Sequence, residues 1–168
     1  MPRSLAIALV VALLPGALMA GGKKAPDLTV TFHLEASAGE RKAFKQLTSG
    51  KEVFYRKSPE ISTKDIIAFR PFPSDDGNSY GMIFQLNKTA AGRLNSLSTA
   101  ERGKLLLSVV NGQVRDAVVI DPIDDALIVI WKRIALKEVH LADQHRPRIG
   151  EDVKSWKKRL KDEKKKKK

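Results

Sequence analysis

The feature that most constrains the fold is a predicted β-hairpin over residues 103–121. Apolar residues alternate on both sides of Asn111-Gly112, and this dipeptide accepts the positive φ angles of a two-residue type I′ turn. We therefore expect strands at about residues 104–110 and 113–120. A hairpin alone has no function, so the function must be argued from other residues.

Residues 1–20 have the pattern of a secretory signal peptide: Arg3, then an apolar run over 5–14, then a Pro-Gly pair and small residues. The run is far short of the ~20 residues that span a bilayer, so a membrane anchor is the less favoured alternative. We expect cleavage near residues 20–22. The mature protein is then expected in the periplasm or secreted.

A chain of 168 residues, 42% of them hydrophobic, can bury one core, so we expect one domain. The chain has no cysteine. This excludes disulfides, a thiolate nucleophile, a cysteine-based zinc site and a lipoprotein anchor.

Alternating apolar residues predict several further strands. These expected strands are Leu28–Leu34, 42–47, 51–57 (after a turn at 48–51), Ile66–Phe69 (stopped by Pro71 and Pro73) and Tyr80–Leu86 (after a turn at 75–78). The run Ala126–Trp131 is apolar at every position, which is typical of a strand in the middle of a sheet.

Helix signals are fewer. A hydroxyl at 62–63 with Asp65 predicts a short helix, and Asn87 is expected to cap a longer one. The apolar stripe of that longer helix is Ala90, Ala91, Leu94 and Leu97. Residues 135–143 fit either a helix or a strand. Val153, Trp156 and Leu160 recur at helical spacing in a strongly basic segment.

No catalytic motif is present, so we expect neither an enzyme nor a cofactor. His33, His140 and His145 are scattered, and His33 is expected to be solvated on the polar side of its strand. Two groups of acidic and amide residues have some potential to bind calcium. They are Asp116, Asp121, Asp124 and Asp125, and Asp75, Asp76 and Asn78. Neither has calcium-loop spacing, so turn formation is the better explanation and no metal site is expected.

From about Lys51 to Asp143, the order of motifs resembles the periplasmic head region of SecD, a translocase subunit that assists protein export. The matching features are Tyr55, Ile61–Ile66, Tyr80–Asn87, Ala91, Leu94, Thr99, Gly103-Lys104, Leu105–Val110, Asn111-Gly112, Val114, Asp116-Ala117, Ile120 and Pro122-Ile123. Two departures are Val118, where such heads usually have proline, and Asp124–Ala126, where they have a glycine-rich turn.

The resemblance implies an α+β fold in which helices cover one face of a mostly antiparallel sheet. It also implies a free-standing head module, because the family's transmembrane helices, which couple proton flow to export, have no counterpart here. The expected layout is a signal peptide (1–20), a linker (21–26), one domain (27–146) and a basic helix with a lysine-rich tail (147–168).

The tail from Lys157 carries much of the charge. It has nine basic residues against Asp162 and Glu163, so it supplies +7 of the formal net charge of +12. The candidate polyanion-binding residues are Lys157, Lys158, Arg159, Lys161, Lys164, Lys165, Lys166, Lys167 and Lys168. A disordered tail that only aids solubility is the alternative, and the five terminal lysines are expected to be disordered in isolation.

Two functions follow from these patterns. The first is a non-catalytic module that binds protein or peptide in the cell envelope, linked to protein export. The second is a structural envelope protein tethered by its tail to an anionic membrane surface or cell-wall polymer. Nucleic acid is an unlikely partner, because no aromatic residues interleave with the lysines.

Overall fold

The computed structural model describes residues 27–166. The predicted signal peptide and linker, and Lys167 and Lys168, lie outside the described residues. In chain order the elements are β1 (Val30–Leu34), β2 (Ala43–Thr48), β3 (Lys51–Arg56), β4 (Ile61–Ser62), the 3₁₀ helix η1 (Thr63–Asp65), β5 (Ile66–Pro73), β6 (Tyr80–Leu86), α1 (Lys88–Ala100), β7 (Leu105–Val110), β8 (Gln113–Val119), β9 (Leu127–Ile134), α2 (Leu136–His145) and α3 (Val153–Lys166). No helix within 27–166 is long and apolar enough to cross a membrane.

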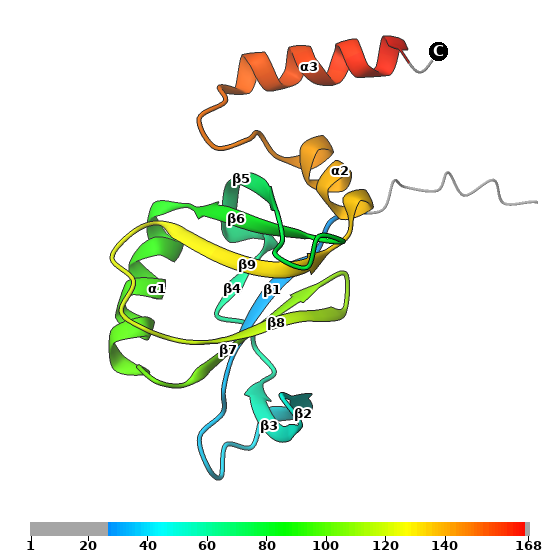
Figure 1. Cartoon of the computed structure of the whole chain (residues 1–168). Coiled ribbons are helices and arrows are strands. Elements are labelled where there is room, and N and C mark those ends of the chain that lie inside the picture. The colour runs from blue at the N-terminus through cyan, green and yellow to red at the C-terminus, as the bar shows by residue number, and fades with distance from the viewer. Residues whose placement is uncertain (1–26, 167–168) are drawn as a thin grey trace, which may run out of the picture.

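The strands form three antiparallel sheets, with orders β4-β1-β7-β8, β5-β6-β9 and β2-β3 (Figure 1). The α+β class is confirmed. The sheets are separate, however, whereas the resemblance implied a single sheet. We call the first two the four-stranded and the three-stranded sheet.

The predicted hairpin is confirmed: β7 pairs with β8 from Leu105↔Val119 to Val110↔Gln113. Asn111 and Gly112 have φ angles of 50° and 75°, the left-handed values that a type I′ turn requires. The side-chain oxygen of Asn111 also accepts a hydrogen bond from the N–H of Thr29, at 3.0 Å, which ties the turn to the start of β1.

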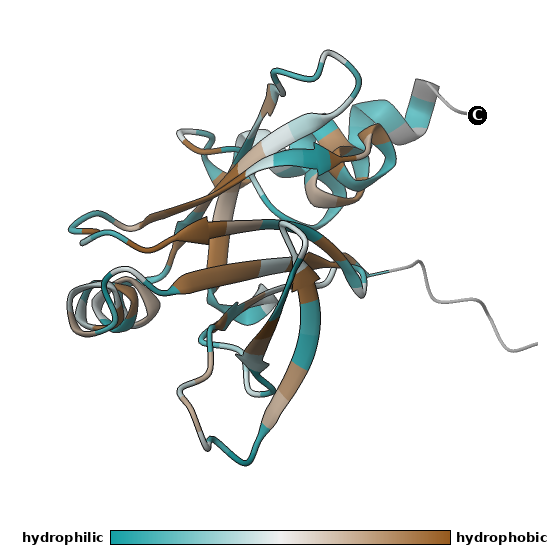
Figure 2. Ribbon diagram, turned by 60° about the horizontal axis from the view of Figure 1, so that its bottom comes forward, coloured by the Kyte–Doolittle hydropathy of each residue, from teal (hydrophilic) through white to brown (hydrophobic). Residues whose placement is uncertain are grey.

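The core lies between the four-stranded and three-stranded sheets. Phe32 of β1 meets Phe84 of β6 edge to face, with ring centroids 6.4 Å apart, and both side chains are buried. Leu94 of α1 and Ile130 of β9 belong to the same apolar cluster. Figure 2 shows the hydrophobic stretches on the strands and the hydrophilic colour of much of α3.

The strand predicted at Ile66–Phe69 is longer than expected, because β5 continues through Pro71 and Pro73. β5 is an outer strand, and the N–H of Phe69 points away from β6 to the carbonyl of Pro147. Strand residues two apart share an orientation, so both prolines lie where no ladder donor is needed.

Residues 135–143, left open between helix and strand, lie mainly in the helix α2. Its Glu138 is almost fully buried and accepts hydrogen bonds from Arg115 of β8 and, at 2.9 Å, from the N–H of Ala135. Asn111 also donates to Glu138, at 3.4 Å. This carboxylate therefore joins α2 to the β7–β8 hairpin.

The predicted basic helix, α3, is docked on the domain by one face. The indole N–H of Trp156 donates to the carbonyl of Asp143, at 2.8 Å. Arg159 donates to both carboxylate oxygens of Glu151, at 3.0 and 2.9 Å, and to Asp143 at 3.1 Å. The helix extends to Lys166, so the expected disorder of the terminal lysines is wrong for 164–166.

We predict that Gly112→Val lowers the free energy of unfolding by about 1 kcal/mol or more, because a β-branched residue resists positive φ. Gly112→Asn should cost less, since asparagine tolerates that conformation. Urea denaturation of the two variants and the parent tests this. Equal stability of the valine variant and the parent would contradict the turn.

A second prediction concerns pH. Hydrogen bonding from Arg159 holds the pKa of Glu151 below its ordinary value, and hydrogen bonds from Ser155 and the Lys154 N–H do the same for the pKa of Asp152. A lowered carboxyl pKa stabilises the start of the helix above the unfolded value, which is about 4.3 for glutamate and about 3.9 for aspartate. This contribution is lost as the pH falls through the lowered pKa.

We therefore expect the first turns of α3, which carry Trp156, to loosen below about pH 4. The readout is Trp156 fluorescence in a Trp131→Phe background, which leaves one tryptophan. Its emission should shift to the red before the domain unfolds, and Arg159→Gln should show the shifted emission already at neutral pH. Constant emission down to the global unfolding transition would contradict this.

Candidate functional site

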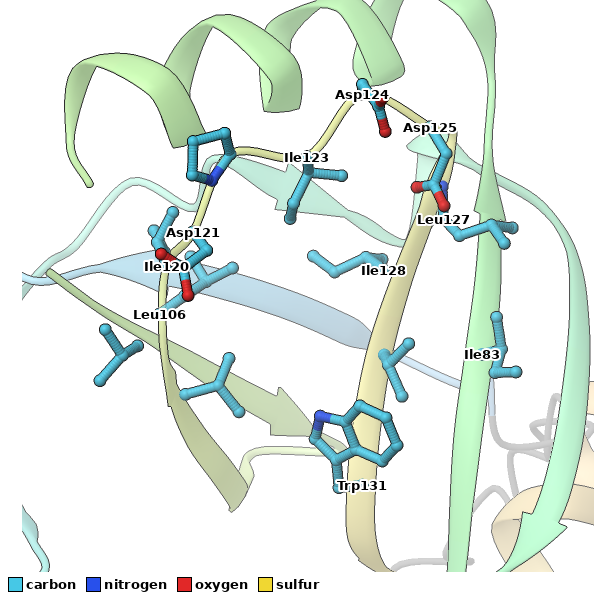
Figure 3. Close-up of a pocket in the computed structure, with 14 residues that line it drawn as sticks. Ile83, Leu106, Ile120, Asp121, Ile123, Asp124, Asp125, Leu127, Ile128 and Trp131 are labelled. Atoms are coloured by element: carbon cyan, nitrogen blue, oxygen red, sulfur yellow. The ribbon is translucent and has the colours of Figure 1, made fainter. Parts of the chain in front are cut away.

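A groove of about 430 Å³ lies where β8, β9 and the connecting residues 120–126 meet (Figure 3). Within the described residues, β8 pairs only with β7 and β9 only with β6, so each is the outer strand of its sheet. The two strands lie side by side without forming a ladder (Figure 1). Their outer edges therefore leave main-chain N–H and C=O groups that no partner strand uses.

The lining of the groove is mostly apolar. The apolar residues along it are Ile83, Leu106, Val118, Val119, Ile120, Pro122, Ile123, Leu127, Ile128, Val129 and Trp131. Val119 and Trp131 are exposed by 60% and 57%, respectively. Large apolar side chains at an open strand edge are a feature of surfaces that bind other molecules.

The prediction that the apolar run Ala126–Trp131 forms a strand in the middle of a sheet is wrong. β9 is an outer strand, and only its inward residues, such as Ile128 and Ile130, are buried in the core. The alternate residues Leu127, Val129 and Trp131 line the groove, which Ile128 also borders. The run is apolar on both faces because one face packs in the core and the other forms the groove.

Helix α1 holds the connecting residues 120–126 in place. The hydroxyl of Ser98, fully buried, accepts a hydrogen bond from the N–H of Ile123 at 2.9 Å. The side-chain amide of Asn95 donates to the carbonyl of Ile123 at 2.8 Å. Sequence analysis missed both anchors. The sequence feature that could have indicated them is the presence of polar residues on α1 next to its apolar stripe.

Trp131 is positioned by the outer face of the three-stranded sheet. Its ring meets Phe72 of β5 at 6.0 Å between centroids. The Phe72 ring reaches it by crossing Gly81 of β6, where a Cβ atom would collide with that ring. Glycine at 81 thus makes room for an aromatic pair beside the groove.

The acidic residues lie in three places, and Asp116 lies on β8, outside the groove lining. Asp121, Asp124 and Asp125 lie on the connecting segment at one end of the groove and give it an acidic rim (Figure 3). Asp76, in contrast, closes its own turn by accepting hydrogen bonds from the N–H groups of Asn78 and Ser79, at 2.9 and 2.8 Å. Within residues 27–166, no three His, Asp or Glu side chains form a group that could hold a metal ion.

The expectation that His33 is solvated is wrong. Its exposure is 9%, because the β2–β3 hairpin covers the outward side of β1. One ring nitrogen bonds the carbonyl of Arg56 and the other the hydroxyl of Thr31, both at 2.9 Å, and Phe44 packs against the ring. Both nitrogens therefore have structural roles. His140 and His145 lie elsewhere, on α2.

The candidate polyanion-binding residues differ in whether they face the domain or the solvent. Arg159 is turned toward the domain and paired with Asp143 and Glu151, so it does not face outward with the others. The remaining described side chains of the set are exposed: Lys157, Lys158, Lys161 and Lys165. Lys164 and Lys166 are helical, while Lys167 and Lys168 lie outside the described residues.

Comparisons with known proteins identify the fold. No protein-family model matches the chain, and no curated protein does. A solved SecDF structure, described as "a membrane component SecDF that enhances protein export", matches with a TM-score of 0.50 and 16% sequence identity. The match covers 69% of this chain and 60% of the SecDF chain.

A second solved SecDF structure, in a form called "Super-membrane-facing", matches with a TM-score of 0.49 and 16% identity, over 68% of this chain and 18% of that one. This chain thus spans less than two thirds of either SecDF chain. At such low identity the likeness concerns the fold alone. The resemblance of the sequence to a SecD head is thereby confirmed for the fold, which over most of this chain is that of SecDF.

Proposed function

We propose that this protein is a non-catalytic module of the cell envelope that binds extended segments of other polypeptides in the groove between β8 and β9, in connection with protein export. The observation that carries the proposal is the pair of unpaired strand edges beside an apolar groove. The SecDF-like fold supports the link to export, and the predicted signal peptide supports the location.

The chemistry of the groove fits an extended chain. An added strand can pair its main-chain groups with an open sheet edge, which gives affinity with little dependence on sequence. Val119, Val129 and Trp131 then offer apolar contact to every second side chain of the bound segment. The acidic rim favours a segment that has lysine or arginine near one end.

The absence of catalysis is also part of the proposal. His33 is engaged through both ring nitrogens, and the acidic rim residues lie on an exposed segment next to apolar side chains. This arrangement supplies contact surface rather than a nucleophile with an oriented base.

The test is binding of a labelled peptide of about eight residues, with alternating valine and threonine and arginine at its ends. Fluorescence anisotropy should show that Trp131→Ala weakens binding about fivefold or more, because an exposed aromatic anchor is lost. A peptide with prolines at alternate positions should not bind, since proline cannot donate to a ladder.

The matched control is Phe54→Ala on β3, which removes an aromatic side chain of similar exposure (53%) away from the groove. The affinity of the Phe54→Ala variant for the peptide should equal that of the parent protein. Equal binding of the two peptides, or a larger loss in Phe54→Ala than in Trp131→Ala, would overturn the proposed site.

A further inference from the structure

Helix α3 presents lysine side chains along one face. Lys154, Lys158, Lys161 and Lys165 follow the spacing i, i+4, i+7, i+11, which places them on one side of an α-helix. All four are exposed, and Lys157, also exposed, lies close to the same side. We call Lys154, Lys158, Lys161 and Lys165 the lysine face.

The opposite side of α3 is attached to the domain. Trp156 and Arg159 make the hydrogen bonds to Asp143 and Glu151, and Leu160 is half-buried near them. Arg159 also lies 3.6 Å from Glu163 on the next turn. The only arginine of the helix is thus neutralised on the inner side, while the lysine face is exposed on the other side.

Attachment fixes the direction in which the charges point. Asp152 begins the helix by accepting hydrogen bonds from the N–H groups of Lys154 and Ser155, at 2.8 and 3.1 Å. A helix held at its start and through Trp156 and Arg159 keeps its outer side as one nearly straight row. Eleven residues at the helical rise span about 17 Å, which is longer than the screening length of about 8–10 Å in ordinary salt.

We infer that the lysine face is a contact surface for the anionic headgroups of a membrane. A row of lysines on one side of a straight helix matches a flat layer of negative charge. Each lysine near such a surface strengthens binding about fivefold. This inference is independent of the groove and its proposed peptide.

Nucleic acid fits the lysine face less well. No aromatic side chain on the outer side of the described helix is available to stack on bases, because Trp156 is turned toward the domain. The outward cations are all lysines, which act as point charges, whereas the arginine fork that suits bidentate phosphate recognition is engaged inside.

The test uses the full chain and sedimentation with vesicles of phosphatidylcholine, with and without about one third phosphatidylglycerol. Neutral vesicles measure any contribution from the apolar residues 1–20, so the proposal concerns only the increase caused by anionic lipid. That increase should fall steeply with added salt.

Two variants with equal net charge separate the lysine face from total charge. The first replaces Lys154, Lys158, Lys161 and Lys165 with glutamine, and the second replaces Lys42, Lys51, Lys57 and Lys88, exposed lysines elsewhere in the domain. We expect the first to lose about tenfold or more of the anionic-lipid binding and the second less than about threefold. Circular dichroism checks that both variants are folded.

Three results would overturn the inference. Equal losses in the two variants would show that only total charge matters. Binding that does not depend on anionic lipid would place the contact elsewhere. Tighter binding to a DNA duplex than to anionic vesicles, lost in the first variant only, would assign the lysine face to nucleic acid.

Discussion

The packing of the four-stranded sheet on the three-stranded sheet is the interaction on which the rest of the structure depends. The two sheets share no ladder of hydrogen bonds, so apolar side chains join them. Phe32 and Phe84 meet between the sheets, with their ring centroids 6.4 Å apart. Truncation of a buried phenylalanine typically costs about 3–5 kcal/mol, a large part of a domain's stability. Joining by side chains also has a geometric consequence: the outer strands β8 and β9 lie beside each other with their edges unpaired.

The elements that depend on local chemistry could be predicted from the sequence. The Asn111-Gly112 turn, the Asn87 cap, whose side chain accepts from the N–H of Ala90 at 2.9 Å, and the alternation along β6 were all predicted. Each of these is determined by residues that are neighbours in the chain, so periodicity and turn preference are sufficient.

The elements that depend on distant contacts could not be predicted. The alternation of β1 places His33 on a polar side, and only the packing of the β2–β3 hairpin buries it. The run at β9 has no property that distinguishes a central strand from an outer strand that lines a groove. Arg159 is one cation among many in the sequence, and its pairing with Asp143 requires the fold of residues 143–152.

The groove and the lysine face belong to one connected framework. β8 forms a wall of the groove, and its Arg115 pairs with the buried Glu138 of α2. At the other end of α2, Asp143 accepts from Arg148 and Arg159 and holds α3. The ion pair at Glu138 and the pairs at Asp143 therefore fix the hairpin and α3 to the two ends of the same helix, α2.

If the lysine face rests on a membrane, these contacts hold the groove at a set orientation to that surface. The acidic rim of the groove and the basic face of α3 then attract different partners, because their charges are opposite.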